Sequence, residues 1–298
     1  MKFCTVNMFL SALMLFSPAC TYIDKTRTYR INDDPLSQPQ MTPVRPETWD
    51  RRNVEIPLPD GNILRGIAIV RSSPRANAIY FGDDAELAQA ATVDITRLSE
   101  KYNINVIFVD YRGRGASSGL TAVKYLPEDA LHVFDKTSRL RREVPTFVIG
   151  VSLGSISATY LAAHRSVQGL MLIAPISSFE DRDMYPKKQK KRMLPWYLAP
   201  TASLFKVKPG FEILENSEPI YQIPHVSAPL LLMHGDADGV IPVLCGKKVY
   251  EAATAKKMLL IVPGLGHNEL SLMDGPGESF MTRFIDECFG PVISSGAY

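Results

Sequence analysis

Residues 146–164 read TFVIGVSLGSISATYLAAH, and this stretch decides the fold of the chain. The apolar run 146–151 predicts a buried strand, and 155–164 has the composition of a helix. Between them lies Gly150-Val151-Ser152-Leu153-Gly154, a GxSxG pattern in a strand–turn–helix setting. The glycines leave room for a strained backbone at Ser152, so its hydroxyl is expected to project from the end of the strand. Ser152 is therefore the candidate nucleophile, and a tight turn without chemistry is the alternative.

Short apolar runs alternate with amphipathic segments on both sides of this turn. Two strands joined at Asp60-Gly61 are predicted first, over 54–70. Such alternation is typical of a mostly parallel sheet that is covered by helices on both faces. The further apolar runs lie at 76–82, 104–110, 169–175, 229–235 and 258–264, and the helical segments at 85–102, 127–140, 248–255 and 278–289.

One long segment, 176–224, interrupts this alternation between two predicted strands. It contains several prolines and the basic run KKQKKR at 187–192. Long insertions with their own content often cover a binding site, so we interpret 176–224 as a lid within an α/β domain that spans 51–290. The basic run either rests on an anionic membrane surface or is a solvated charged face.

The first 20 residues have the layout of an export signal. Their apolar stretch, from Phe9 to Phe16, is too short to span a bilayer. Cys20 follows small residues and resembles the lipidated cysteine of a bacterial lipobox; cleavage by an ordinary signal peptidase and an uncleaved anchor are the alternatives. Residues 21–50, rich in Pro, Ser and Gln, then form a tether. We expect a membrane-anchored lipoprotein of the cell envelope, or otherwise a periplasmic or secreted protein.

Composition and charge exclude some classes of protein. Hydrophobic residues make up 46% of the chain and charged residues 21%, which allows a packed core and argues against global disorder. A net charge of +2 gives no support to binding of nucleic acid.

Cys245 and Cys288 remain outside the export segment, and they either pair or are buried thiols. No CxxC motif and no Cys/His cluster is present, so no structural zinc site is expected.

A serine hydroxyl needs a base, and one histidine is placed for that role. His267 lies in the glycine-rich segment 263–268, directly after the last apolar run, where its side chain can reach across the end of the sheet. Asp236 and Asp238 both follow the strand at 229–235. We favour Asp238 as the acid that orients the imidazole and Asp236 as a turn residue. The other histidines are read as helix, loop or turn residues: His132, His164, His225 and His234.

Four segments together resemble one known family. They are DYRGRG with Ser118-Gly119 (110–119), GVSLG (150–154), HGDADGVIP (234–242) and GLGHN (264–268). The chain resembles the BEM46/ABHD13-like branch of the α/β-hydrolases, near the serine aminopeptidase S33-like group, over roughly residues 54–289. The resemblance implies an α/β-hydrolase fold with a lid insertion and a triad of Ser152, Asp238 and His267.

One segment departs from that family. His-Gly-Asn-Ala-Gly is usual after the early strand, and this chain reads Phe81-Gly82-Asp83-Asp84-Ala85. The backbone N–H groups of Asp83 and Leu153 are expected to form the oxyanion hole. Two carboxylates beside a developing negative charge are unfavourable unless they point to solvent, and a helix-capping role is the alternative.

These features predict a serine hydrolase that cleaves acyl or lipid-like esters through an acyl-enzyme, without metal or cofactor. The expected partners are a small acyl ester and, through Cys20, a membrane. Two alternatives stay open: a peptidase or amidase with the same triad, and a non-catalytic, hydrolase-like binding lipoprotein whose oxyanion loop is spoiled by Asp83 and Asp84.

The predicted lipid anchor can be tested at Cys20. Cys20→Ala removes the thioether that would carry the acyl chains, so the protein should move from the membrane fraction to the soluble fraction. Immunoblots of separated fractions measure this shift. Unchanged membrane retention of the variant would count against lipidation.

Overall fold

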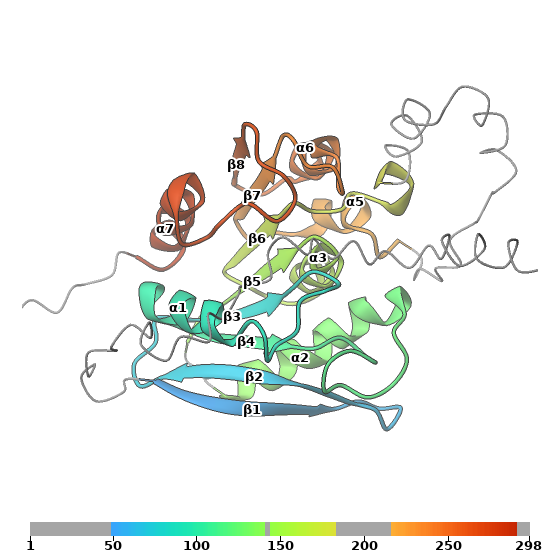
Figure 1. Ribbon diagram of the computed structural model, residues 1–298, viewed down its shortest axis with the longest axis vertical. Coiled ribbons are helices and arrows are strands. Elements are labelled where there is room, and N and C mark those ends of the chain that lie inside the picture. Colours follow the sequence, from blue (N-terminus) through green and yellow to red (C-terminus); the bar gives the residue numbers. More distant parts are fainter. Residues whose placement is uncertain (1–48, 141–143, 183–215, 291–298) are drawn as a thin grey trace, which may run out of the picture. The chain divides into compact units, whose positions relative to one another are not determined.

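An eight-stranded sheet organises the part of the chain that the computed structural model describes, residues 49–140, 144–182 and 216–290. The strand order is β1-β2-β4-β3-β5-β6-β7-β8 (Figure 1). β2 pairs antiparallel with both β1 and β4, whereas every pairing from β4 to β8 is parallel. The strands are β1 (Trp49–Pro57), β2 (Ile63–Arg71), β3 (Ala76–Phe81), β4 (Ile104–Val109), β5 (Thr146–Val151), β6 (Gly169–Ile173), β7 (Leu230–Gly235) and β8 (Lys257–Val262).

Helices cover both faces of this sheet, as the sequence predicts. Ile95 of α1 and Phe284 of α7 are buried in one apolar cluster against one face. Val133 of α2, Leu161 of α3 and Val249 of α6 are buried in a second cluster on the opposite face. The helical segments are α1 (Thr92–Tyr102), η2 (Val123–Tyr125), α2 (Leu126–Leu140), α3 (Gly154–His164), α5 (Pro219–Gln222), η4 (Ile223–His225), α6 (Val243–Ala252) and α7 (Gly275–Phe289). The prediction of an α/β-hydrolase sheet with two helical layers is confirmed.

The burial of the strands follows their place in the sheet. β4 and β6 are buried along their whole length, as expected of sequences that are apolar except for Asn105, whose amide donates to Asn77 Oδ1 at 2.8 Å. β1 lies at the edge and buries only Val54 and Ile56 fully; apart from Pro57, its exposed residues are charged or polar. The turn between β1 and β2 lies at Asp60-Gly61, as predicted, and Gly61 has a φ of 84° that suits glycine.

The predicted helix 85–102 begins later than expected, at Thr92. Asp83 Oδ1 accepts the N–H groups of Ala85 and Glu86, both at 2.7 Å, which folds this segment into a turn of its own. The N–H of Ala88 is donated to Asp110 Oδ1 at 2.7 Å, so it does not enter a helical ladder. Side-chain acceptors therefore compete with the helix over its first predicted turns.

Cys245 and Cys288 are both free thiols. Cys245 lies in α6 and Cys288 lies in α7, and these two helices cover opposite faces of the sheet. Of the two alternatives for these residues, unpaired thiols is the one that the structure supports.

The predicted lid is described only at its two ends. Residues 176–182 follow β6, and 216–224 lead through α5 and η4 toward β7. The basic run 187–192 lies outside the described residues.

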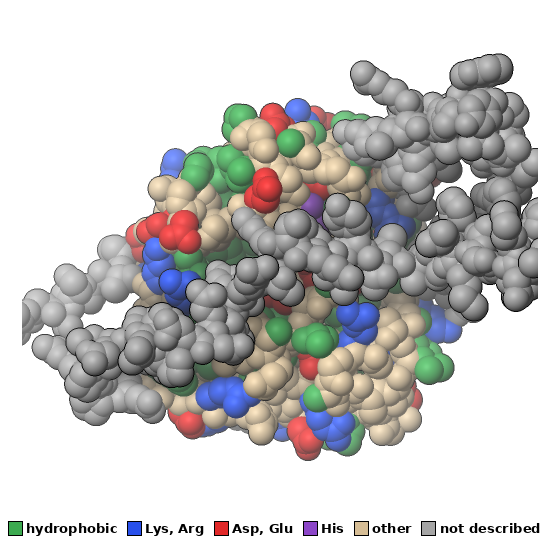
Figure 2. Space-filling model, viewed as in Figure 1, with side chains coloured by type: hydrophobic (Ala, Val, Ile, Leu, Met, Phe, Trp, Pro, Cys, Tyr) green, Lys and Arg blue, Asp and Glu red, His purple; other side chains and the backbone are tan. Residues whose placement is uncertain are grey.

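The predicted export segment 1–20 with Cys20, and the tether 21–50 up to residue 48, also lie outside the described residues. None of the helices within the described residues combines the length and the apolar character that crossing a membrane requires. On the face drawn in Figure 2, acidic and basic side chains of the described residues are interspersed, in keeping with the net charge of +2.

Candidate active site

Three predicted side chains meet at the carboxyl edge of the parallel strands. Ser152 follows β5, Asp238 follows β7 and His267 follows β8. His267 Nε2 lies 2.9 Å from Ser152 Oγ, and His267 Nδ1 lies 2.6 Å from Asp238 Oδ2. Residues that are 115 and 29 positions apart in the sequence are thus joined in one hydrogen-bonded chain.

The turn at Ser152 has the strained backbone that the GxSxG pattern predicts. Ser152 has a φ of 51°, which few residues other than glycine adopt, and its N–H is donated to Ile173 O at 2.9 Å. A Cβ at Gly154 would lie 2.1 Å from Phe81 O, and one at Gly150 would lie 2.6 Å from Ala158 Cβ. Both glycines are therefore required for the close packing of β5, α3 and the end of β3.

The loops that carry the acid and the base are joined to each other by hydrogen bonds from the Asp236 side chain and from the backbone. Asp236 Oδ1 accepts the N–H of Gly264 at 2.6 Å, and the N–H of Ala237 is donated to Leu265 O at 3.1 Å. A Cβ at Gly235 would lie 2.2 Å from Leu265 O, so only glycine allows this approach. Asp236 is a turn residue, as predicted, and it helps to aim the segment before His267 across the sheet edge.

Asp238 is buried, with 2% of its surface exposed, and it is ionised. Burial raises its pKa, but hydrogen bonds from His234 and His267 outweigh burial and hold the pKa well below its usual range. Asp238 Oδ1 also accepts the N–H groups of Val240 and Ile241, both at 2.8 Å. A carboxylate held in this way can fix the tautomer of His267 with the proton on Nδ1, which leaves Nε2 to accept from Ser152.

The expected oxyanion donors come from the residue after Ser152 and from the loop after β3. Leu153 is at the N-terminal end of α3, where backbone N–H groups have no partner within the helix. Asp83 follows β3, and its carboxylate is occupied by the two N–H groups of its own turn, so it acts as a turn residue. The Asp84 side chain is exposed. The helix-capping alternative for Asp83 is wrong in detail, because α1 begins only at Thr92 and Asp83 caps a turn before it.

The DYRGRG segment, residues 110–115, supports the loop after β3 that contains Asp83. Tyr111 Oη donates to Gly82 O at 2.7 Å, directly before Asp83. Asp110 is structural, because its carboxylate accepts the N–H groups of Ala88 at 2.7 Å and Ala116 at 3.0 Å.

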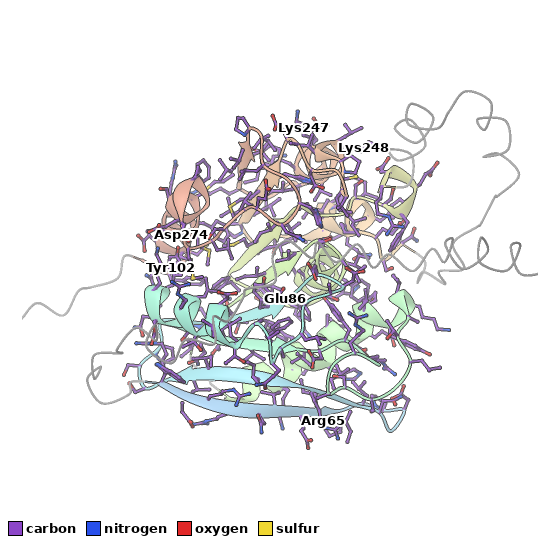
Figure 3. All side chains as sticks on the ribbon, in the orientation of Figure 1. Arg65, Glu86, Tyr102, Lys247, Lys248 and Asp274 are labelled. Atoms are coloured by element: carbon purple, nitrogen blue, oxygen red, sulfur yellow. The ribbon has the colours of Figure 1, made fainter. Side chains whose placement is uncertain are left out.

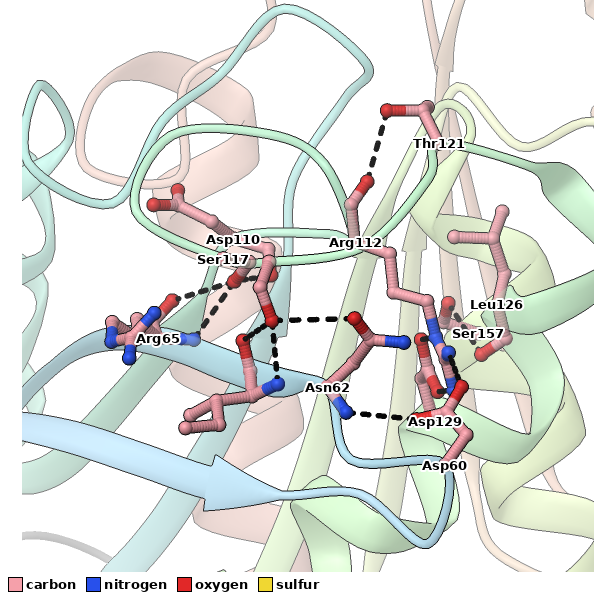
Figure 4. A network of polar contacts seen from close by, with 12 residues as sticks. Asp60, Asn62, Arg65, Asp110, Arg112, Ser117, Thr121, Leu126, Asp129 and Ser157 are labelled. Atoms are coloured by element: carbon pink, nitrogen blue, oxygen red, sulfur yellow. Dashed lines mark hydrogen bonds and ion pairs between the residues drawn. The ribbon is translucent and has the colours of Figure 1, made fainter.

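A cavity of about 190 Å³ opens beside Leu153. One wall is the segment 110–122, which a polar network holds in place (Figure 4). In that network the buried Arg112 guanidinium donates to both oxygens of Asp129, at 2.7 and 2.8 Å, and it also pairs with Asp60. The lining mixes apolar side chains with charged groups: Asp84, Tyr111, Arg112, Arg114, Thr121, Ala122, Val123, Tyr125, Leu126, Asp129, Leu153, Phe179 and Arg182.

Glu86 carries a half-buried carboxyl group in the loop that contains Asp83 (Figure 3). The sequence analysis did not single out this residue. Burial, together with the charge of Asp83, raises its pKa to about 7. Tyr80 Oη donates to Glu86 Oε2 at 3.3 Å. The residue lies in a stretch with helical composition, and no local pattern distinguishes it from a surface glutamate.

Glu86 should make stability depend on pH. The unfolded chain loses this proton near the ordinary glutamate pKa of 4.5 and the folded chain near a pKa of about 7, so the free energy of unfolding should fall as pH rises between these values. Glu86→Gln removes the ionisation. On going from pH 4.5 to pH 8, the free energy of unfolding of the variant should rise by about 2–3 kcal/mol relative to that of wild type. Urea unfolding across this range measures the difference.

A matched control is Glu251→Gln, at an exposed position of α6. It should keep the pH dependence of wild type. Parallel stability curves for wild type and Glu86→Gln would contradict the assignment.

Comparisons with known proteins agree with this architecture. The family described as serine aminopeptidase, S33, matches residues 92–221. Human protein ABHD12B is 30% identical over 207 residues, which cover 64% of this chain and 56% of that protein. The lysophosphatidylserine lipase ABHD12 of Macaca fascicularis is 28% identical over 170 residues, 54% of this chain and 41% of that protein. The chain thus spans about half the length of the curated relatives it matches.

Solved structures show the same fold at low sequence identity. The esterase Pf2001 of Pyrococcus furiosus aligns with a TM-score of 0.64 and 18% identity, over 81% of this chain and 92% of that chain. Acetyl xylan esterase 1 of Thermoanaerobacterium aligns with a TM-score of 0.56 and 16% identity, over 83% and 86%. The chain belongs to the α/β-hydrolase superfamily. Its place in the BEM46/ABHD13-like branch stays a prediction.

Proposed function

We propose that this protein is a serine hydrolase that cleaves acyl or lipid-like esters through a covalent acyl-enzyme. The observation that carries the proposal is the continuous chain Ser152 Oγ–His267 Nε2 and His267 Nδ1–Asp238 Oδ2, at 2.9 and 2.6 Å. Hydroxyl, imidazole and buried carboxylate in this order form the machinery of nucleophilic acyl transfer.

In the first half of the reaction, Ser152 Oγ bonds to the ester carbonyl carbon while His267 Nε2 takes the hydroxyl proton. The carbonyl oxygen becomes an oxyanion, which the N–H groups of Asp83 and Leu153 stabilise. The tetrahedral intermediate collapses, and the C–O bond to the alcohol breaks as His267 returns the proton to the departing oxygen. Water then attacks the acyl-enzyme by the same route, releasing the acid and restoring Ser152.

The cavity beside Leu153 supports an acyl ester as substrate. Apolar side chains from η2, α2 and the segment after β6, among them Val123, Leu126 and Phe179, form much of its lining. A pocket of this kind accepts an acyl chain by burial of apolar surface. Relatives named as a lysophosphatidylserine lipase and structural neighbours named as esterases favour the same substrate class.

A peptidase or amidase is the second candidate, because the matching family is described as serine aminopeptidase. The same triad serves both reactions, so only substrates separate them. Higher kcat/KM on aminoacyl p-nitroanilides than on every p-nitrophenyl ester would favour the peptidase. A non-catalytic binding protein is disfavoured, because the carboxylate of Asp83 is engaged in its own turn.

Export and lipidation at Cys20 belong to this proposal. A lipid anchor would hold the hydrolase at the surface from which acyl lipids are drawn. The apolar segment before Cys20 supports it.

The nucleophile can be tested with a fluorophosphonate probe, which reacts with activated serines. Wild type should be labelled at Ser152, and Ser152→Ala should lose all labelling and ester hydrolysis because no other hydroxyl is paired with His267 among the described residues. Fluorescence of the labelled band and peptide mass spectrometry measure this. Ser227→Ala, an exposed serine outside the site, should label as wild type. Full labelling of Ser152→Ala would end the proposal.

The acyl pocket can be tested by narrowing it at Val123. Val123→Phe adds bulk to the cavity wall, so kcat/KM for p-nitrophenyl octanoate should fall at least about tenfold relative to kcat/KM for the acetate. Kinetics over an ester series from two to twelve carbons measure the change. An equal loss for every chain length would place the acyl group elsewhere.

A further inference from the structure

His234 is a buried residue near the carboxyl end of β7, next to Asp238. It belongs to β7 and none of its surface is exposed. Its Nε2 lies 3.2 Å from Asp238 Oδ2 and 3.0 Å from Ile241 O. Both neighbouring atoms are acceptors, so Nε2 carries the proton and donates toward them.

The other ring nitrogen of His234, Nδ1, is buried and makes no hydrogen bond to the described residues. A Cβ at Gly246 would lie 2.5 Å from Nδ1, and one methyl carbon of Leu232 would lie 3.2 Å from that same Cβ, so α6 closes tightly over this side of the ring. A buried polar atom without a partner is unfavourable, and a phenylalanine of similar size would avoid it. What an imidazole adds at this position is the single N–H at Nε2.

That N–H lies between Ile241 O, which is 3.0 Å from Nε2, and Asp238 Oδ2, which is 3.2 Å from it, so it adds a further donor beside the carboxylate. Oδ1 accepts from the backbone of Val240 and Ile241, and Oδ2 faces both His234 Nε2 and His267 Nδ1. A carboxylate offers about four lone-pair sites, so donors on all sides prevent it from turning. Two imidazole N–H groups on one oxygen also divide its negative charge between them.

We propose that His234 is a positioning residue of the triad, whose Nε2–H holds Asp238 Oδ2 in place for His267 and shares the charge of that oxygen. This inference rests on the proposed function, because it concerns how the same triad works. The competing interpretation is a purely structural one, in which His234 only ties β7 to the carbonyl of Ile241.

Two substitutions separate these interpretations. His234→Phe keeps a planar ring but removes the N–H, whereas the amide of His234→Gln can return an N–H to about the same place. In His234→Phe, kcat/KM on p-nitrophenyl acetate should fall at least about tenfold. Losses of this size are common when a hydrogen-bond partner that orients a functional side chain is removed, as in metal sites. The acid limb of its pH profile should move to higher pH, because an undivided charge on Asp238 favours the imidazolium form of His267. His234→Gln should recover most of the rate and the wild-type acid limb.

Rates are taken per folded site, from thermal unfolding and from titration of Ser152 with the fluorophosphonate. An unmoved acid limb in folded His234→Phe, or a folded His234→Gln that fails to recover the rate, would overturn the positioning role. If wild type neither labels nor hydrolyses any ester, the proposed function itself has failed, which is a different outcome.

A measurement on wild type keeps the inference testable if the variants do not fold. Long-range ¹H–¹⁵N correlation spectra report which ring nitrogen of a histidine is protonated. His234 should show the tautomer with the proton on Nε2. A proton on Nδ1 instead would overturn the inference, because Nε2 could not then donate to Asp238.

Discussion

The parallel pairing from β4 to β8 is the constraint on which the site depends. Because these strands run in one direction, the segments after β3, β5, β7 and β8 all emerge at one edge of the sheet. Close backbone contacts then reduce the remaining freedom, and these occur at Gly154, against the end of β3, and at Gly235, against the loop of His267. The hydrogen bonds of Ser152, His267 and Asp238 are short because strands and glycines have already placed their backbones.

Burying a carboxylate at that edge is costly, and the structure offsets the cost with donors rather than with a cation. Asp238 is surrounded by backbone N–H groups and two imidazoles. Neutral donors stabilise the anion without cancelling its charge. In the proposed reaction, the charge therefore stays available to the imidazolium of His267 that forms when Ser152 is deprotonated. An arginine at the same place would hold Asp238 ionised but would repel that imidazolium.

Patterns that act locally allowed the sheet and the triad residues to be predicted from the sequence. The strand–turn–helix around Ser152 and the glycines before His267 identify themselves within a few residues. The start of α1 was predicted wrongly, because the acceptors that unwind it include Asp110, distant in sequence from Ala88. The contact of His234 with Asp238 and the raised pKa of Glu86 were also missed, although the groups involved lie within a few residues of each other in the sequence. Both arise from what folding packs around a side chain, which composition and periodicity do not encode.

The acidic oxyanion segment shows how such packing changes the meaning of a sequence. In the sequence alone, Asp83, Asp84 and Glu86 place three negative charges near the expected oxyanion hole, where the proposed reaction creates a fourth. In the structure Asp83 folds its carboxylate into its own turn, Asp84 is exposed, and burial leaves Glu86 largely uncharged below its pKa of about 7. Tyr111 meanwhile holds the carbonyl of Gly82, so the backbone before Asp83 is fixed by a neutral group. These carboxyl groups are thus engaged, exposed or largely neutral, and the backbone N–H groups that stabilise the oxyanion in the proposed reaction do not depend on the side chains beside them.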